Sequence, residues 1–210
     1  MYATTLCKPV KSCTVLSAAL LSGSLLGMLS ASASAEDVEM DVMGKISASV
    51  GEQSGEWVTI AGSMQGESGS SAELSSMAIT ERMTQWNLQV QGHDPESDSI
   101  LRENVLSINV HLGTGDDPVE MAASPSSTEI MLFIEGGPIS GTLYAGEGTD
   151  VEVEIESLEF DGEQGHTLGH FHGELCFLDM SNISAGRDED DCVSVEGEFD
   201  TQLAHDHTDM

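Results

Sequence analysis

Two stretches near the carboxyl end decide the fold: GHFHGELCF at residues 169–177 and CVSVEGEFDTQL at residues 192–203. In both, apolar residues or glycine alternate with polar residues, which is the period-two pattern of a strand that buries one face. Both also contain the pattern G-x-F-x-x-x-L, which indicates two strands with similar roles in one sheet. The side chains of His170, His172 and Cys176 then share the polar face of the first strand.

The cysteines predict how these two strands are joined. Of the four cysteines in the chain, Cys7 and Cys13 lie in a predicted leader segment, which leaves Cys176 and Cys192 as an even pair. An even pair of cysteines in an exported chain predicts a disulfide. The sequence holds no C-x-x-C motif, which argues against a thioredoxin-like redox site or a zinc knuckle.

A disulfide between directly opposed cysteines sets the antiparallel register of the two strands. The numbers of opposed residues then add up to 368, which places His172 opposite Glu196 and His170 opposite Glu198. The same register sets each phenylalanine of the pair against a glycine, a common way to pack rings across two strands. The sequence therefore predicts a ladder of imidazoles and carboxylates on the polar face.

The histidines near this end form the sharpest functional hypothesis. Two imidazoles at positions i and i+2 of one strand can both bind Zn²⁺ or Cu²⁺. The predicted register also brings the chain end after Leu203 near His166, so a histidine from the chain end could complete the site. The alternative is an exposed ladder of histidine and glutamate followed by a flexible tail, with no bound metal. The candidate zinc or copper ligands are His166, His170, His172, His205 and His207.

A run of four acids, DEDD at residues 188–191, lies in the loop that the disulfide is predicted to close. Calcium binds about six to eight oxygen ligands from carboxylates and carbonyls, so Asp188, Asp190 and Asp191 are candidate calcium ligands. The run lacks EF-hand spacing and the glycine that such a loop needs. A solvated acidic loop is therefore the alternative interpretation.

Period-two alternation continues through the rest of the chain after residue 35. Apolar residues or glycine hold the even positions from 38 to 50, and similar runs recur at 86–90, 106–112 and 151–155. Turn signals separate these runs about every ten residues. The pattern predicts an all-β fold, namely a single antiparallel β-sandwich or small β-barrel of eight to ten strands.

Three segments give finer expectations. Residues 130–134 are apolar on both faces, which is typical of a central strand. Residues 74–83 fit a helix only partly and a strand only partly. The apolar positions change parity near Ser157, which indicates a β-bulge there.

The first 35 residues are predicted to be a secretory signal peptide. Lys8 and Lys11 form a positive region, an uncharged run follows, and ASA at residues 33–35 matches the small-x-small cleavage pattern. A membrane anchor is the alternative, but the apolar run is shorter than the ~20 residues of a spanning helix, and no later segment is apolar enough to span a bilayer. The expected organisation is a signal peptide at 1–35, a β-sandwich or barrel domain at 36–204 and a flexible His/Asp tail at 205–210.

The charge is strongly negative, with 37 Asp and Glu against 6 Lys and Arg and a formal net charge of −31. Such a chain offers no basic patch for a nucleic acid or for an anionic membrane surface. Because the acids are dispersed, the charge favours a saline exterior or periplasm, such as that of a marine or halophilic bacterium, where salt screens self-repulsion. An acidic cation-binding function is the alternative.

The sequence holds no nucleophile elbow, Walker loop, dinucleotide fingerprint or zinc-protease motif. Carboxylates are so abundant that no pair of them indicates glycoside chemistry. The first hypothesis is a secreted or periplasmic, non-catalytic β-domain that acts in binding, adhesion or envelope structure. A periplasmic metal-binding protein is the second, and a hydrolase with a carboxylate site is the third. The sequence names no cofactor beyond the candidate zinc, copper or calcium ions.

Overall fold

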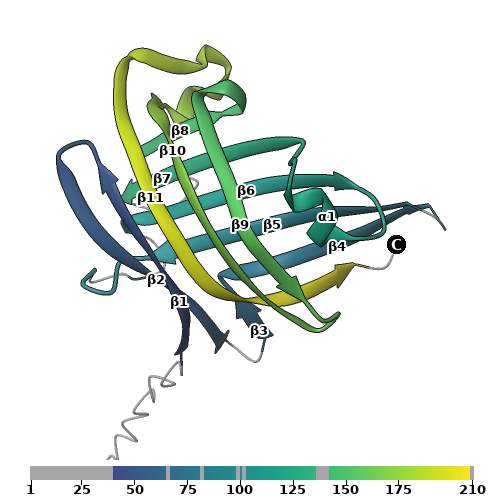
Figure 1. Cartoon of the computed structure of the whole chain (residues 1–210). Helices are drawn as coiled ribbons and strands as arrows, with labels where there is room; N and C mark the ends of the chain where they lie inside the picture. Colours follow the sequence, from purple (N-terminus) through teal and green to yellow (C-terminus); the bar gives the residue numbers. More distant parts are fainter. Residues whose placement is uncertain are drawn as a thin grey trace, which may run out of the picture. The chain divides into compact units, whose positions relative to one another are not determined.

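The computed structural model describes residues 40–64, 67–80, 83–97, 100, 103–135 and 142–208 (Figure 1). The chain divides into two units, Met1–Glu36 and Asp37–Met210, and every described residue belongs to the second. The predicted signal peptide lies outside the described residues. Within the described part of the chain, no helix has both the length and the apolar character needed to cross a membrane.

Strands make up nearly all of the described secondary structure, so the predicted all-β fold is confirmed. The only described helical segments are one short α-helix and two 3-10 helices. In chain order the elements are β1 (Met40–Val50), β2 (Gln53–Met64), β3 (Glu67–Ser70), β4 (Ala72–Thr80), β5 (Met83–His93), β6 (Val105–Thr114), α1 (Pro118–Ala122), β7 (Ser127–Glu135), β8 (Thr142–Glu147), η1 (Gly148–Asp150), β9 (Val151–Phe160), β10 (Gln164–Leu178), η2 (Met180–Ala185) and β11 (Arg187–Thr208).

All eleven strands belong to one hydrogen-bonded sheet, in the order β3-β2-β1-β11-β4-β5-β6-β7-β8-β10-β9. Two further pairings, β2 with β5 and β10 with β11, close a ring through eight strands. The strand count exceeds the eight to ten that the sequence predicts, partly because β3 lies in a Gly/Ser-rich stretch without alternation. The end of β11 runs parallel to β4, which departs from the purely antiparallel expectation.

The main hydrophobic core lies on one face of this sheet. Phe171 of β10 and Phe199 of β11 are 1% and 0% exposed and are its largest fully buried side chains. Burying a side chain of this kind stabilises the fold by about 1.5–3 kcal/mol. The other large, fully buried members are Ile46, Leu74, Leu88, Leu106, Ile108, Ile130, Leu175, Leu203, Val90 and Val110.

Strand β7 contributes to two clusters. Ile130 and Leu132 belong to the main core, whereas Phe133 packs with Val105 and Leu143 in a separate cluster. Because successive side chains of a strand point to opposite faces, β7 is apolar on both. Its place between β6 and β8 confirms the prediction of a central strand.

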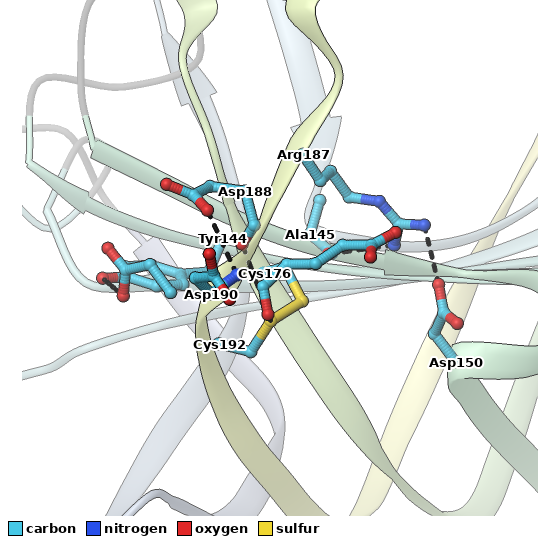
Figure 2. Close-up of a disulfide and its surroundings, with 10 residues drawn as sticks. Tyr144, Ala145, Asp150, Cys176, Arg187, Asp188, Asp190 and Cys192 are labelled. Carbon is cyan, nitrogen blue, oxygen red and sulfur yellow. Dashed lines mark hydrogen bonds and ion pairs between the residues drawn. A yellow bond between two sulfur atoms is a disulfide. The ribbon is translucent and has the colours of Figure 1, made fainter.

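The hairpin of β10 and β11 has the predicted register. The pairing runs without interruption from Gln164 opposite Ala204 to Cys176 opposite Cys192, and a disulfide joins these two cysteines (Figure 2). Their Cα atoms are 4.0 Å apart. The predicted disulfide is therefore confirmed.

Each ring of this hairpin occupies the space above a glycine. A Cβ atom at Gly169 would lie 2.5 Å from Cζ of Phe199, and one at Gly197 would lie 2.8 Å from Cζ of Phe171. Neither distance is compatible with a side chain, because rings in a packed core have no room to retreat. The glycines are therefore required by the packing of the rings across the strand pair.

Beyond the disulfide the structure differs from the expectation of a long acidic loop. After a register shift, Phe177 lies opposite Asp188 and Leu178 lies opposite Arg187. Strand pairing therefore resumes, and the connection consists mainly of η2. The Arg187 guanidinium forms an ion pair of 2.7 Å with Asp150 and donates to the Ala145 carbonyl at 3.3 Å (Figure 2). These contacts hold the acidic segment against β8 and η1.

Residues 74–80 of the segment with the ambiguous pattern lie in strand β4, which pairs with the end of the described chain, whereas residues 81–82 lie outside the described residues. Leu74 and Ser76 of β4 face the core, and residues 205–208 of β11 continue parallel to β4. The expected boundary at residue 204 therefore falls inside β11, so residues 205–208 are not a tail. The His205 ring explains this difference, because it stacks on the Trp86 ring with centroids 5.8 Å apart. An aromatic contact therefore holds residues 205–208 in place, although their side chains are polar.

Candidate functional site

The polar outer face of β9, β10 and β11 carries the predicted ladder. Strand β10 lies between β9 and β11, so each outward histidine of β10 has a neighbour on both sides (Figure 1). Those neighbours are glutamates in two successive rows. The two Glu–His–Glu rows are Glu152–His172–Glu196 and Glu154–His170–Glu198.

His170 contacts two carboxylates of β9. Its Nε2 lies 3.2 Å from Oε2 of Glu154, and its Nδ1 lies 3.2 Å from Oε1 of Glu156. The second contact depends on a register shift, because Glu156 is the extra residue between the partners of Leu168 and Gly169. This confirms the predicted bulge near Ser157. A neutral imidazole has a single N–H, so one ring nitrogen then keeps a lone pair that can bind a metal ion.

His172 has a looser contact of the same kind. Its Nε2 lies 3.5 Å from Oε2 of Glu152. The His170 side chain is 44% exposed and the His172 side chain 61% exposed, so all three histidine–glutamate contacts face solvent. Exposed pairs of this type contribute about 0–1 kcal/mol to folding. The rows therefore do little for stability, and their side chains can rearrange around a ligand at low cost.

The β11 side of the rows opens into a shallow depression. No described residue forms a hydrogen bond or ion pair with the side-chain carboxylates of Glu196 and Glu198, whose backbones pair within the sheet. Next to them, β1 and β2 present serines instead of long side chains. The depression has a volume of about 610 Å³ and is lined on its outer side by Ser47, Ser49, Ser54, His170, His172, Glu196 and Glu198.

His166 lies on the same face but farther along β10. Its Nε2 donates to Oδ1 of Asp200 at 2.8 Å. Four residues separate it from His170, which corresponds to about 13 Å along a strand. His166 therefore shares the face of the rows without sharing their ligand space.

His205 is separated from the other candidates. It lies on the core side of β11, where its Nδ1 donates to the Gly162 carbonyl at 3.0 Å and its Nε2 lies 3.0 Å from Oγ of Ser76. Its ring also meets Phe160 edge to face. His207 lies opposite Ser76 in the parallel pairing of β11 with β4. The structure does not bring His205 to the outward histidines of β10.

The candidate calcium ligands make local contacts (Figure 2). The Asp190 amide donates to Oδ1 of Asp188 at 3.1 Å, and the Tyr144 hydroxyl donates to Oδ1 of Asp191 at 3.2 Å. Burial, followed by this bond to Asp191, raises the pKa of the Tyr144 hydroxyl. Whether these acids bind calcium stays a prediction.

Converging metal-ligand atoms are rare in the described part of the chain. The one group of three within 4.8 Å of one another there consists of Glu174, Cys176 and Cys192, and its two sulfurs are bonded to each other. The disulfide instead has a positioning role. It lies on the same face as the rows, four residues from His172, and so holds the histidines of β10 in register with the glutamates of β11.

The sequence-based interpretation missed the glutamates of β9, which flank the histidines of β10 on the side opposite β11. It paired β10 with β11 but did not pair β10 with β9, so Glu152, Glu154 and Glu156 were not among its candidates. A signal was present, because Asp161-Gly162 is a typical hairpin turn between two alternating runs. Extending a register back from a two-residue turn at Asp161-Gly162 would have reached the glutamates with an error of one residue, because the observed turn lies one residue later and β9 carries a bulge.

Chemically, the two Glu–His–Glu rows offer two imidazole nitrogens, a wall of carboxylates on each side and space beside them. Two histidines at i and i+2 have Cα atoms about 7 Å apart, a spacing from which both rings can reach one cation. The carboxylates give this face a negative potential that attracts cations. Comparisons of the chain with protein-family models, with curated proteins and with solved structures give no match.

Proposed function

We propose that this chain is a non-catalytic, exported binding protein that holds a divalent transition-metal ion, Zn²⁺ or Cu²⁺, on the two Glu–His–Glu rows. The observation that carries the proposal is the placement of His170 and His172 at i and i+2 of one strand, each flanked by glutamates from both neighbouring strands. Imidazole suits zinc and copper, and carboxylates complete such sites. His166, His205 and His207 are not part of the proposed ligand set.

The proposed site assembles by rotation of exposed side chains. His170 and His172 supply nitrogen ligands, and the carboxylates of Glu196 and Glu198 are available because no described residue engages them. The small serines of β1 leave room for bound water above the sheet. Because protons compete for imidazole nitrogens, metal affinity falls as the solution becomes more acidic.

The compartment is part of the proposal. A disulfide in the β10–β11 hairpin is compatible with a secreted or periplasmic protein, because such bonds persist in oxidising compartments. The dispersed negative charge is compatible with a saline surrounding that screens it.

Titration of the full, metal-free chain with Zn²⁺ and with Cu²⁺ in a calorimeter tests the proposal. We expect one ion per chain, and we expect the double variant His170→Ala/His172→Ala to weaken binding by at least about tenfold. His111→Ala is the matched control, because His111 is an exposed histidine on β6 outside the rows. Equal affinity and stoichiometry in the double variant and the control would overturn the proposal.

A further inference from the structure

A second surface of the molecule is the free edge of β9, which shares Glu152 and Glu154 with the proposed metal site. Within the described part of the chain, β9 pairs with β10 alone and stands at the end of the sheet order. An edge strand presents unpaired amides and carbonyls that can accept a further strand.

Two contacts show which backbone amides and carbonyls of β9 point away from β10. The Val151 carbonyl accepts a bond of 3.3 Å from the Thr128 hydroxyl of β7, so it points away from β10. The Glu154 carbonyl points the other way, because it lies 2.5 Å from where a Cβ of Gly169 would sit on β10. Backbone groups alternate in direction along an antiparallel strand, so those of Val153 and Ile155 also face outward. No described residue bonds to them.

The space beside this edge is a groove. It has a volume of about 720 Å³ and lies between β9 and the segment that connects α1 to β7. The five residues of β9 along it span about 17 Å, the length of a five-residue extended peptide. The groove is lined by Ala122, Ala123, Ser124, Pro125, Ser126, Ser127, Thr128, Gly148 and residues 151–155.

The two faces of the edge differ in chemistry. Val151 and Val153 are buried on the core side, 4% and 5% exposed. Glu152 and Glu154 are exposed on the outer side, and the residues lining the groove include no lysine or arginine. An added strand therefore meets apolar neighbours on one face and carboxylates on the other.

We propose that the edge of β9 binds an extended basic segment of a partner protein by strand addition. Lysine or arginine side chains at alternate positions would lie beside Glu152 and Glu154, and small apolar residues between them would lie beside Val153. A second copy of β9 fits this edge poorly, because the glutamate rows of two copies would oppose each other.

Synthetic peptides test this in the full chain, with a chelator present so that metal binding plays no part. We expect KVKVK, blocked at both ends, to bind one-to-one and EVEVE to bind at least tenfold more weakly. N-methylation of the two valines removes the amides that would face β9, whereas N-methylation of the lysines leaves them intact. We expect the first modification to weaken binding at least tenfold and the second to change it less than threefold.

Two measurements on the protein complete the test. Hydrogen exchange should show that KVKVK protects the amides of Val153 and Ile155. The double variant Glu152→Gln/Glu154→Gln should weaken KVKVK binding at least threefold, while the exposed control pair Glu52→Gln/Glu96→Gln should leave it unchanged. Absence of binding, equal binding of both peptides, equal loss on either N-methylation, or dimerisation of the chain through β9 would each overturn the proposal.

Discussion

The β10–β11 hairpin and two shorter pairings, β11 with β4 and β2 with β5, are built in different ways. The hairpin is antiparallel, is joined by a disulfide and carries its histidines on an exposed face. Each of the two shorter pairings holds a histidine among packed side chains, His93 at β2–β5 and His205 at β11–β4. Exposed histidines with acidic neighbours are available to a ligand, whereas the enclosed ones serve the fold.

The largest expected effect is a difference in stability between variants at two adjacent residues of β10, which lie on opposite faces of the sheet. Phe171→Ala removes a buried ring packed on Gly197 and should lower the free energy of unfolding by about 3–5 kcal/mol. His172→Ala, one residue away on the exposed face, should change it by less than about 0.5 kcal/mol. Urea unfolding of both variants measures the difference. Similar losses would show that the exposed rows stabilise the fold, contrary to the proposed ligand role.

Removal of the disulfide should have the next largest effect. The bond closes a loop with a sequence separation of 16, and its loss in Cys176→Ser/Cys192→Ser should cost about 3 kcal/mol. If the bond also holds the two Glu–His–Glu rows in register, zinc affinity should fall under conditions where the variant is still folded. Unchanged zinc affinity in the folded variant would show that the core alone sets the register.

The hairpin could be predicted from the sequence because a disulfide relates two distant residues directly. Once Cys176 was paired with Cys192, alternation determined the faces of residues 164–176 and 192–204. The pairing of β9 with β10 was missed, although a turn signal was present. The glutamates that β9 contributes to the candidate site were therefore missed as well. The metal and calcium assignments stay predictions, because ligation depends on rotations of exposed side chains that no sequence pattern specifies.

The two shorter pairings, β11 with β4 and β2 with β5, could not be predicted in the same way. Alternation reports which face of a strand is buried but not which strand lies beside it, so sandwich and barrel patterns look alike. Residues 205–208 contain histidine and aspartate and have the composition of a tail. His205 belongs to the packed structure through its contacts with Trp86 and Phe160 and its bonds to Ser76 and Gly162, all of them distant in the sequence.

A third prediction concerns the pairing of β2 with β5. His93 is 3% exposed, and burial lowers its pKa, an effect partly offset by its bond of 2.8 Å to the Ile100 carbonyl. Below about pH 6.5 the unfolded chain therefore binds a proton that the folded chain does not, so stability falls with falling pH until the folded-state pKa is reached.

His93→Gln should reduce this slope in the same pH window, by up to about 1.4 kcal/mol per pH unit for one proton. Urea unfolding of the wild type and the variant between pH 7.5 and pH 5 measures the difference in slope, whatever the variant's stability at pH 7.5. Parallel curves would mean that His93 accepts a proton in the folded state as readily as in the unfolded state.

The smallest expected effect lies at the parallel pairing of β11 with β4. Burial, followed by the charge of Asp206, raises the pKa of the half-buried Glu73 carboxyl. At pH values between the ordinary glutamate pKa and the raised folded-state pKa, the folded chain keeps a proton on Glu73 that the unfolded chain has released. The free energy of unfolding therefore falls as the pH rises through this window.

Glu73→Gln should therefore stabilise the chain at pH 7, by no more than about 0.5 kcal/mol because solvent screens this half-exposed carboxyl, and by much less near pH 4, where both states mostly hold the proton. Asp206→Asn should give a smaller gain at pH 7, because it removes only the second cause. The exposed rows supply the contrast: neutralising Glu198, which has solvent around it and His170 across the strand, should bring no such gain. A gain at pH 4 equal to that at pH 7 would assign the effect of Glu73→Gln to packing. The charge of Glu73 would then contribute as little to the stability of the β11–β4 pairing as the exposed glutamates contribute to the stability of the hairpin.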